Sequence, residues 1–174
     1  MKVPHIPIGG ETLLGTGCAR APGGKGANQA VAASRLGAIV KMVGRVGDDE
    51  FGTFLRKTLE DAGVDASKVK SESNNTTGLA FILLDAAGQN SIAVIQGANL
   101  ILSKKDVKAL SPLFEESRIL LLQLEIATDA IKEAIKQAKK SGLQVVLDAG
   151  PPTRLEPELL KQIDVLSPNE TELG

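Results

Sequence analysis

Apolar residues recur along this 174-residue chain with two spacings, one typical of amphipathic helices and the other of strands. The helical spacing predicts three longer helices, each ending beside a glycine, over residues 27–36, 51–62 and 128–141. Thr128 is the expected cap of the last of these. Shorter helices are expected from the capping residue Ser103 to Leu110, and in a proline-bounded segment before residue 164. Runs rich in Val, Ile and Leu predict strands over residues 40–46, 119–124, 144–148 and 164–167.

The order of these elements indicates the fold class. Strands alternate with helices for most of the chain, and this alternation predicts a parallel sheet with helices on both faces. Residues 119–124 are almost all apolar, which is typical of a strand buried on both faces of such a sheet. We therefore expect an α/β protein.

Residues 77–95 have a different pattern. Two β-rich runs, residues 77–84 and 91–95, flank a short turn that contains Gly88. This arrangement predicts an antiparallel hairpin. With residues 11–21 it would form a small β appendage.

Composition excludes several classes of function. Lys and Arg (20) balance Asp and Glu (21), so nothing favours binding to nucleic acid or to an anionic membrane. The lone Cys18 excludes an internal disulfide, and the lone His5 has no evident triad or metal partner. Neither a membrane span nor a signal peptide is recognisable. These features predict a cytoplasmic protein, or an organellar one if a longer precursor exists.

The most informative segment is the glycine loop, residues 22–30, in which Gly23, Gly24 and Gly26 surround Lys25 before a helical stretch. Glycines allow a close approach of ligand to backbone, and a helix N-terminus offers unpaired N–H groups. Lys25 adds a charged donor and Asn28 an amide. The loop therefore suits a ligand rich in oxygen, such as a sugar or a phosphate.

Polar residues follow three predicted strands: Glu125, Asp148 and Asn169. Ligands of open α/β sheets bind beyond the carboxyl ends of the strands, so these residues are expected to meet a ligand held by the glycine loop. For Asp148 a simple helix cap is an alternative.

Two common nucleotide motifs are absent. A P-loop needs a glycine five positions before the Gly of Gly-Lys and a hydroxyl residue after the lysine, but Ala19 and Gly26 occupy those positions. No Gly-x-Gly-x-x-Gly occurs either. The acidic run at residues 48–50 could bind a cation, although a helix N-terminal role fits it better.

The glycine loop and several further segments resemble the phosphofructokinase-B type of sugar kinases, and within it the ribokinases. Lys25 and Gln29 favour ribokinases over fructokinase or adenosine kinase relatives. The resemblance spans nearly the whole chain, and its further segments are residues 35–38, 43–52, 97–99, 122–125 and 167–172.

The resemblance implies an activity and a set of site residues. The family transfers the γ-phosphate of ATP to a sugar hydroxyl, which is O5 of ribose in ribokinases. Asn169 would bind the nucleotide phosphates, and Glu172 would act on Mg²⁺ indirectly. The residues implied in ribose binding are Gly23, Gly24, Lys25, Gly26, Asn28 and Glu125.

The resemblance also implies a ribokinase-like fold, a three-layer parallel sheet with a small β lid. The lid strands would lie at about residues 10–21 and 77–96, and the α/β core at residues 22–76 and 97–174. In this family the lid covers the sugar and pairs two subunits, so a homodimer is expected.

By the same resemblance the chain is expected to be incomplete. Family members begin with a strand that ends in an Asn-x-Asp motif, and they continue past residue 172 to the catalytic base, the adenine pocket and a K⁺ site. We therefore expect no catalytic residue within this chain. Two hypotheses stay open: a ribokinase of which this sequence is a part, and a non-catalytic truncated isoform that binds sugar weakly or pairs with full-length subunits. A nucleotide-independent sugar-binding module is a third.

Overall fold

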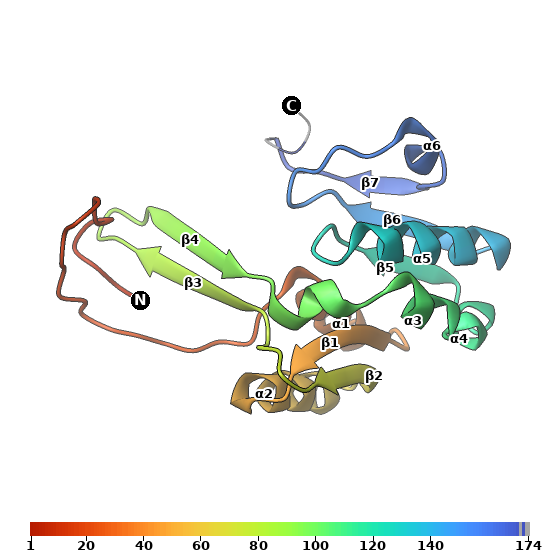
Figure 1. Ribbon diagram of the computed structural model, residues 1–174, viewed down its shortest axis with the longest axis horizontal. Coiled ribbons are helices and arrows are strands. Elements are labelled where there is room, and N and C mark those ends of the chain that lie inside the picture. The colour runs from red at the N-terminus through yellow and green to blue at the C-terminus, as the bar shows by residue number, and fades with distance from the viewer. Residues whose placement is uncertain (171, 173–174) are drawn as a thin grey trace.

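The computed structural model describes residues 1–170 and residue 172, and it shows an α/β body from which a long hairpin projects (Figure 1). The helices are α1 (Lys25–Arg35), α2 (Glu50–Asp61), η1 (Gly97–Ile101, a 3₁₀ helix), α3 (Lys104–Lys108), α4 (Ser111–Glu115), α5 (Thr128–Lys140) and α6 (Pro157–Leu160). The strands are β1 (Lys41–Gly47), β2 (Asp65–Glu72), β3 (Leu79–Leu84), β4 (Asn90–Ile95), β5 (Ile119–Leu122), β6 (Gln144–Asp148) and β7 (Val165–Ser167). No described helix is long and apolar enough to cross a membrane.

The parallel strands form two sheets in the described part of the chain. One pairs β1 with β2, and the other has the order β5-β6-β7. In register, Arg45 lies opposite Lys70 in the first sheet, and Leu122 lies opposite Leu147 in the second. Parallel strands between helices are thus confirmed, whereas β2 was missed because most of its residues are polar or charged.

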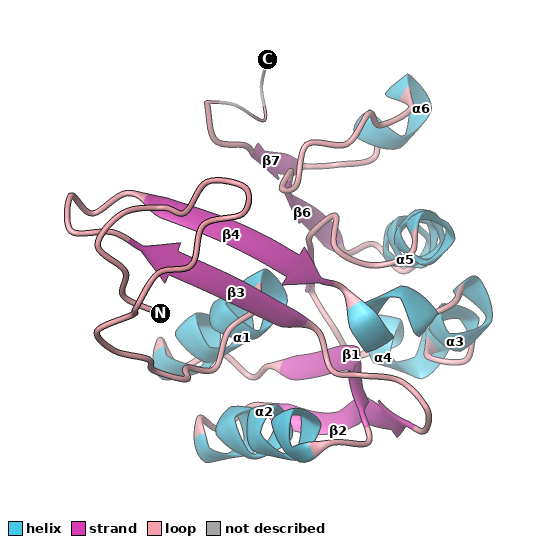
Figure 2. Ribbon diagram, turned by 60° about the vertical axis from the view of Figure 1, so that its left-hand side comes forward, coloured by secondary structure: helices cyan, strands magenta, loops and turns pink. Residues whose placement is uncertain are grey.

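Helices pack on both faces of β1 and so form two cores. Val46 packs with Ala30 of α1 and Leu59 of α2, whereas Val43 packs against the core under α5. Figure 2 shows α1 and α2 on one side of the strands and α3, α4 and α5 on the other. The larger core lies between α5 and the strands β5 and β6, where Ile135 and Leu147 are fully buried.

Burial of residues 119–124 on both faces is a wrong prediction for the described structure. The strand ends at Leu122, and its face toward α5 is covered, but Ile119 and Leu121 on the other face are exposed. Helices α1 and α2 are the ones on that side, and they pack on β1 and β2 instead.

Helix caps agree with the sequence in part: Ser103 is confirmed, Thr128 is not, and Asp49 of the acidic run caps a helix that it was expected only to favour by its charge. Asp49 caps α2 by accepting a hydrogen bond from the Gly52 N–H at 2.8 Å. Ser103 caps α3 in a capping box with Asp106. Thr128 is not a cap: it is the first residue of α5, and Ala127 precedes it in the cap position with no side-chain bond.

The hairpin is confirmed as antiparallel strands β3 and β4, with Leu79 opposite Ile95 and Leu84 opposite Asn90. Residues 11–21 do not form a third regular strand. In the described chain this segment contributes a single β-bridge, between Gly17 and Lys2, and Lys2 in turn bridges to Leu84.

A buried polar cluster fixes the root of the hairpin to the body. The Thr77 backbone N–H and hydroxyl both donate to the Asp49 carboxylate, and the Thr77 hydroxyl oxygen accepts from the Gly47 N–H at 2.9 Å. On the other strand of the root, Ala98 N–H donates to Thr76 O at 2.8 Å. Of the acidic run at residues 48–50, Asp49 therefore has the helix N-terminal role that the sequence favoured.

Candidate functional site

The glycine loop leads directly into α1, which begins at Lys25, two residues earlier than predicted. Gly24 occupies the cap position with φ of 94°, a conformation that side chains disfavour. Because Gly24 has no side chain to cap the helix, the first N–H groups of α1 stay available to a ligand.

Lys25 lies at the centre of the candidate site. Its Nζ donates to Asp148 Oδ1 at 3.1 Å, at the carboxyl end of β6, and lies 3.8 Å from Glu172 Oε1. The hydrogen bond to Asp148 raises the pKa of Lys25, and the charges of Asp148, Glu172 and Glu125 raise it further against the effect of desolvation. The ammonium group is therefore surrounded by three carboxylates from different parts of the sequence.

Two glutamines that were not predicted as site residues extend this cluster. Gln29, one turn after Lys25 on α1, donates from Nε2 to Asp148 Oδ2 at 2.9 Å. Gln123, just after β5, donates from Nε2 to Gln29 Oε1 at 2.5 Å. The helical spacing of Lys25 and Gln29 was the one signal in the sequence that both could reach the same partner. Asp148 is thus no helix cap; it contacts the glycine-loop helix.

Glu125 follows β5 and is partly buried beside Lys25 and Asp148. Desolvation raises the pKa of its carboxyl group; the Lys25 charge opposes this shift, and the Asp148 charge adds to it. Among residues 1–170 and 172, none donates a hydrogen bond to this carboxylate. Glu125 is therefore an acceptor that is open to a ligand.

Asn169 and Glu172 form a closed turn after β7. Asn169 N–H donates to Glu172 Oε2 at 2.8 Å, and Glu172 N–H donates to Asn169 Oδ1 at 2.9 Å. The Glu172 side chain is 6% exposed and points to Lys25. The structure thus brings Glu172, which was predicted on the phosphate side, to Lys25 of the predicted sugar loop, and Asn169 is bonded to Glu172.

The other loop residues have different surroundings. Gly23 and Asn28 line a groove of about 310 Å³ between α1 and α2. Gly26 packs against Gln123 and Met42, and a side chain there would displace the end of Gln123. The structure therefore does not place Asn28 in the hydrogen-bond network of Lys25.

Comparison with known proteins shows the family of the chain. A family model described as pfkB family carbohydrate kinase matches residues 4–174. The chain belongs to this family. The ribokinase of Haemophilus influenzae is 41% identical over 172 residues, which cover 99% of this chain and 56% of that protein. The ribokinase of Bacillus subtilis is 39% identical over 166 residues, covering 95% of this chain and 56% of the relative. The chain spans about half the length of the curated relatives it matches.

Solved ribokinase structures superpose closely on the chain. The Arabidopsis thaliana ribokinase complexed with ribose and ATP gives a TM-score of 0.86 at 38% identity, covering 99% of this chain and 56% of that one. The Thermotoga maritima ribokinase also gives 0.86, at 36% identity and with the same coverage. The ribokinase-like α/β fold is therefore confirmed for the described residues.

Proposed function

We propose that this chain forms the sugar-binding part of a ribokinase, an enzyme that transfers the γ-phosphate of ATP to D-ribose. The observation that supports this best is the position of Lys25, between the open carboxylate of Glu125 and the Asn169–Glu172 turn. Sugar and phosphate would meet at this point.

The chemistry of the site matches a sugar. Ribose hydroxyls both donate and accept hydrogen bonds, so they need a donor and an acceptor side by side. Lys25 supplies the donor and Glu125 the acceptor, while the exposed N–H groups at the start of α1 accommodate further oxygens. In this proposal Gly23, Gly24, Gly26 and Asn28 form the wall of the loop.

ATP and Mg²⁺ would lie on the side of Asn169 and Glu172. In the described chain no three His, Cys, Asp or Glu side chains gather in a way that could hold a metal ion. Mg²⁺ usually binds through one or two carboxylates together with phosphate oxygens and water, and in this proposal Glu172 acts on it through phosphate oxygens or water. Bound Mg²⁺ would neutralise phosphate charge, and Lys25 would supply positive charge on the sugar side.

We also propose that the hairpin is the lid of this site and pairs two copies of the chain. Its apolar side chains are exposed on both faces, and Phe81, Ile92 and Val94 are among them. A second copy would bury this surface. Cytoplasmic location stays a prediction.

Titration calorimetry with D-ribose tests the proposed function. We expect the chain to bind D-ribose, and Glu125→Gln and Lys25→Ala each to raise Kd roughly tenfold or more. Lys41→Ala is the matched control, because Lys41 pairs with Glu116 instead of with the site. If the unaltered chain does not bind D-ribose, or if neither site variant changes Kd, the proposal is wrong.

A coupled assay for D-ribose-dependent ADP formation separates binding from catalysis. We expect binding without turnover, since the catalytic base is expected outside this sequence. That result would favour the non-catalytic alternative for these 174 residues taken alone. Turnover that Lys25→Ala abolishes would show that the chain contains the base.

A further inference from the structure

We propose that Asp148 is the positioning residue for Lys25, and that Gln29 and Gln123 hold Asp148 in place for that task. The inference rests on the proposed function only in taking Lys25 as a sugar-binding group. Asp148 would bind no ligand itself; its effect on ribose would pass through the lysine.

The hydrogen bonds of Asp148 separate it from Glu125. Asp148 Oδ1 accepts from Lys25 Nζ and from the Gly150 N–H, each at 3.1 Å, and Oδ2 accepts from Gln29 Nε2. Three donors of the protein therefore occupy a carboxylate that has about four acceptor positions. Glu125, which interacts through its charge with the same lysine, receives none from the described residues. One carboxylate is committed to the protein and the other is open to a ligand.

The two glutamines determine which group donates and which accepts in this network. Gln29 donates to Asp148 and at the same time accepts from Gln123, so its amide group can satisfy both partners in one orientation only. The resulting chain joins the end of β5, helix α1 and the end of β6. Asp148, at the end of β6, is thereby held in place relative to α1 and β5.

Gly150 explains why Lys25 can reach this position. A Cβ atom on residue 150 would overlap the Lys25 ammonium group and the Glu172 carboxylate. The Gly150 carbonyl also accepts from the Leu124 N–H at 3.2 Å, which ties this turn to the residue before Glu125. The absence of a side chain therefore leaves the space that the lysine fills.

Holding Lys25 in place matters because a free lysine side chain has many rotamers, and ordering them on binding reduces affinity. Without Asp148, the ammonium group would still be attracted by Glu172 and Glu125. It would then mask the acceptor that the sugar needs. Loss of Asp148 should weaken ribose binding as long as Lys25 is present.

A double-mutant cycle on D-ribose binding tests this dependence. We expect Asp148→Asn, which keeps the shape and removes the charge, to raise Kd roughly tenfold. The double variant Lys25→Ala/Asp148→Asn should bind no more weakly than Lys25→Ala alone. If the two losses multiply, Asp148 acts independently of Lys25 and the inference is overturned.

The matched control is Asp164→Asn. Asp164 also binds a lysine, Lys139 at 2.7 Å, and accepts from a backbone N–H, that of Val145, but at the other end of the same sheet. The variant Asp164→Asn should leave the Kd for D-ribose unchanged. A rise equal to that of Asp148→Asn would mean that general loosening of the sheet explains both, which overturns the inference.

Urea unfolding of the unaltered chain, Lys25→Ala, Asp148→Asn and the double variant tests the coupling of Lys25 and Asp148 without a ligand. We expect the unfolding constant of the double variant to be roughly two- to fivefold smaller than the two single effects predict, the coupling of a partly exposed ion pair. If the chain binds no ribose, the proposed function fails, while coupling in unfolding still supports the inference and additivity overturns it.

Gly150→Ala, which keeps every charge, should raise Kd in the Lys25 protein and leave it unchanged in the Lys25→Ala background.

Discussion

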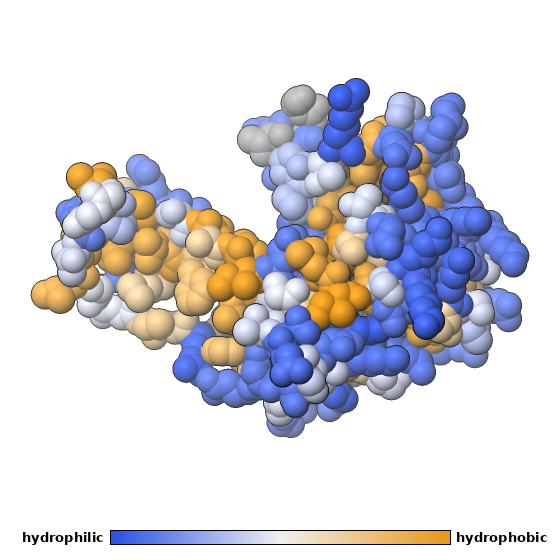
Figure 3. Space-filling view, in the orientation of Figure 1, coloured by the Kyte–Doolittle hydropathy of each residue, from blue (hydrophilic) through white to orange (hydrophobic). Residues whose placement is uncertain are grey.

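The body and the arm of this molecule differ in how far their apolar side chains are buried. We call residues 1–20 and 79–95, which include β3, β4 and their turn, the arm, and the other described residues the body. In the body, α5 covers one face of β5 and β6 and Ile135 is 0% exposed, although Ile119 and Leu121 on the other face of β5 are exposed. In the arm, neighbouring residues Phe81 and Ile82 point to opposite faces and are 56% and 47% exposed. Figure 3 shows apolar surface gathered over the arm and polar surface over most of the α5 side.

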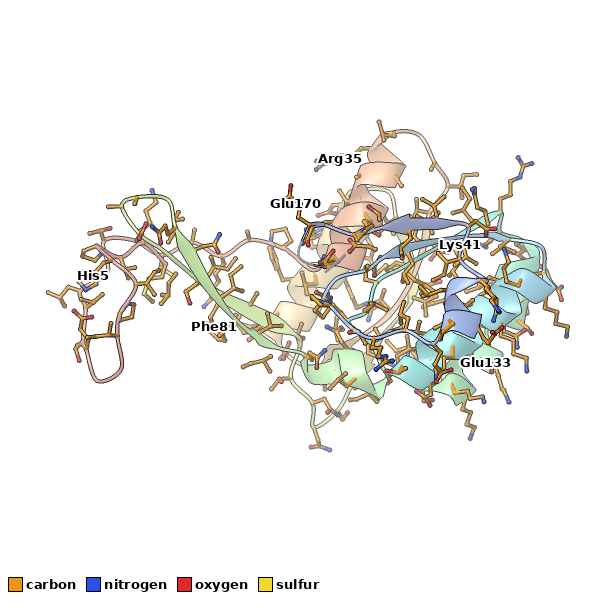
Figure 4. All side chains as sticks on the ribbon, turned by 90° about the horizontal axis from the view of Figure 1, so that it is seen from above. His5, Arg35, Lys41, Phe81, Glu133 and Glu170 are labelled. Carbon is orange, nitrogen blue, oxygen red and sulfur yellow. The ribbon has the colours of Figure 1, made fainter. Side chains whose placement is uncertain are left out.

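This difference shows that the two regions are stabilised differently. A two-stranded hairpin is marginal in water unless something packs on it. The side-chain view places Phe81 along the arm and His5 near its far end, away from the body with Glu133 (Figure 4). The arm therefore depends on its root and on whatever covers its faces, whereas the body has its own cores.

The largest expected effect comes from breaking the body core. Ile135→Ala should lower the free energy of unfolding by about 3–5 kcal/mol, because it leaves a cavity between α5 and the sheet. Ile92→Ala, at a position 52% exposed on the arm, should cost less than about 1 kcal/mol. The chain has no Trp or Tyr, so urea unfolding is best followed by circular dichroism. Equal losses would contradict the contrast between the regions.

Next in size is the junction of body and arm. Asp49→Asn removes the charge that caps α2 and binds Thr77, and it should cost about 2–3 kcal/mol. Asp48→Asn is the matched control at an exposed neighbouring position. A similar loss in both variants would show that the Thr77 cluster does not hold the arm.

Asp49 also makes the stability of the chain depend on pH. Hydrogen bonds from Thr77 and Gly52 outweigh desolvation and lower the pKa of Asp49 below 3.8. Its contribution to stability is therefore present above pH 3.8 and is lost as the pH falls through the folded-state pKa. Acid titration of unfolding should show this loss in the unaltered chain and not in Asp49→Asn.

A smaller effect is expected on self-association of the arm. Val94→Lys places a charge on its exposed apolar face, and it should raise the dimer Kd roughly tenfold or more in sedimentation equilibrium. Ile39→Lys introduces the same charge at a position of the body that is 97% exposed, and it should have no effect. A chain that remains monomeric before any substitution would remove the dimer proposal.

The smallest effect concerns the ligand site of the body. Burial raises the pKa of Glu125 above 4.5, and its acceptor form predominates only above the raised value. D-ribose affinity should therefore rise with pH through that value. Calorimetry on Glu125→Gln should give a flat profile over the same range; a parallel rise would assign the dependence to another group.

Much of this arrangement was predictable from local patterns. Helical spacing of apolar residues, the glycine loop, the hairpin turn, the cap at Ser103 and the acidic start of α2 depend on interactions between residues a few positions apart. The polar ends of the strands indicated where ligands would meet, because parallel strands end at one edge. The resemblance to ribokinases supplied the sugar and phosphate roles, which await the tests above.

Other features could not be read from such patterns. Strand β2 lacks an apolar run because only Ala66 and Val69 of it are buried, and the exposed face of β5 depends on which strands α1 and α2 cover. Likewise, Thr77 showed no sign of binding Asp49, since the two meet only when the hairpin root folds back on β1.

The sequence by itself indicated most of the elements, the family and the glycine loop as a candidate ligand site, since each of these depends on short-range spacing and residue type. The tertiary structure alone decided that Lys25 faces Asp148, a residue 123 positions away, and that Gln29 and Gln123 complete the network. The physical reason is that hydrogen bonds between side chains require a separation of about 3 Å, and only the packing of α1 against the ends of β5 and β6 brings these groups so close.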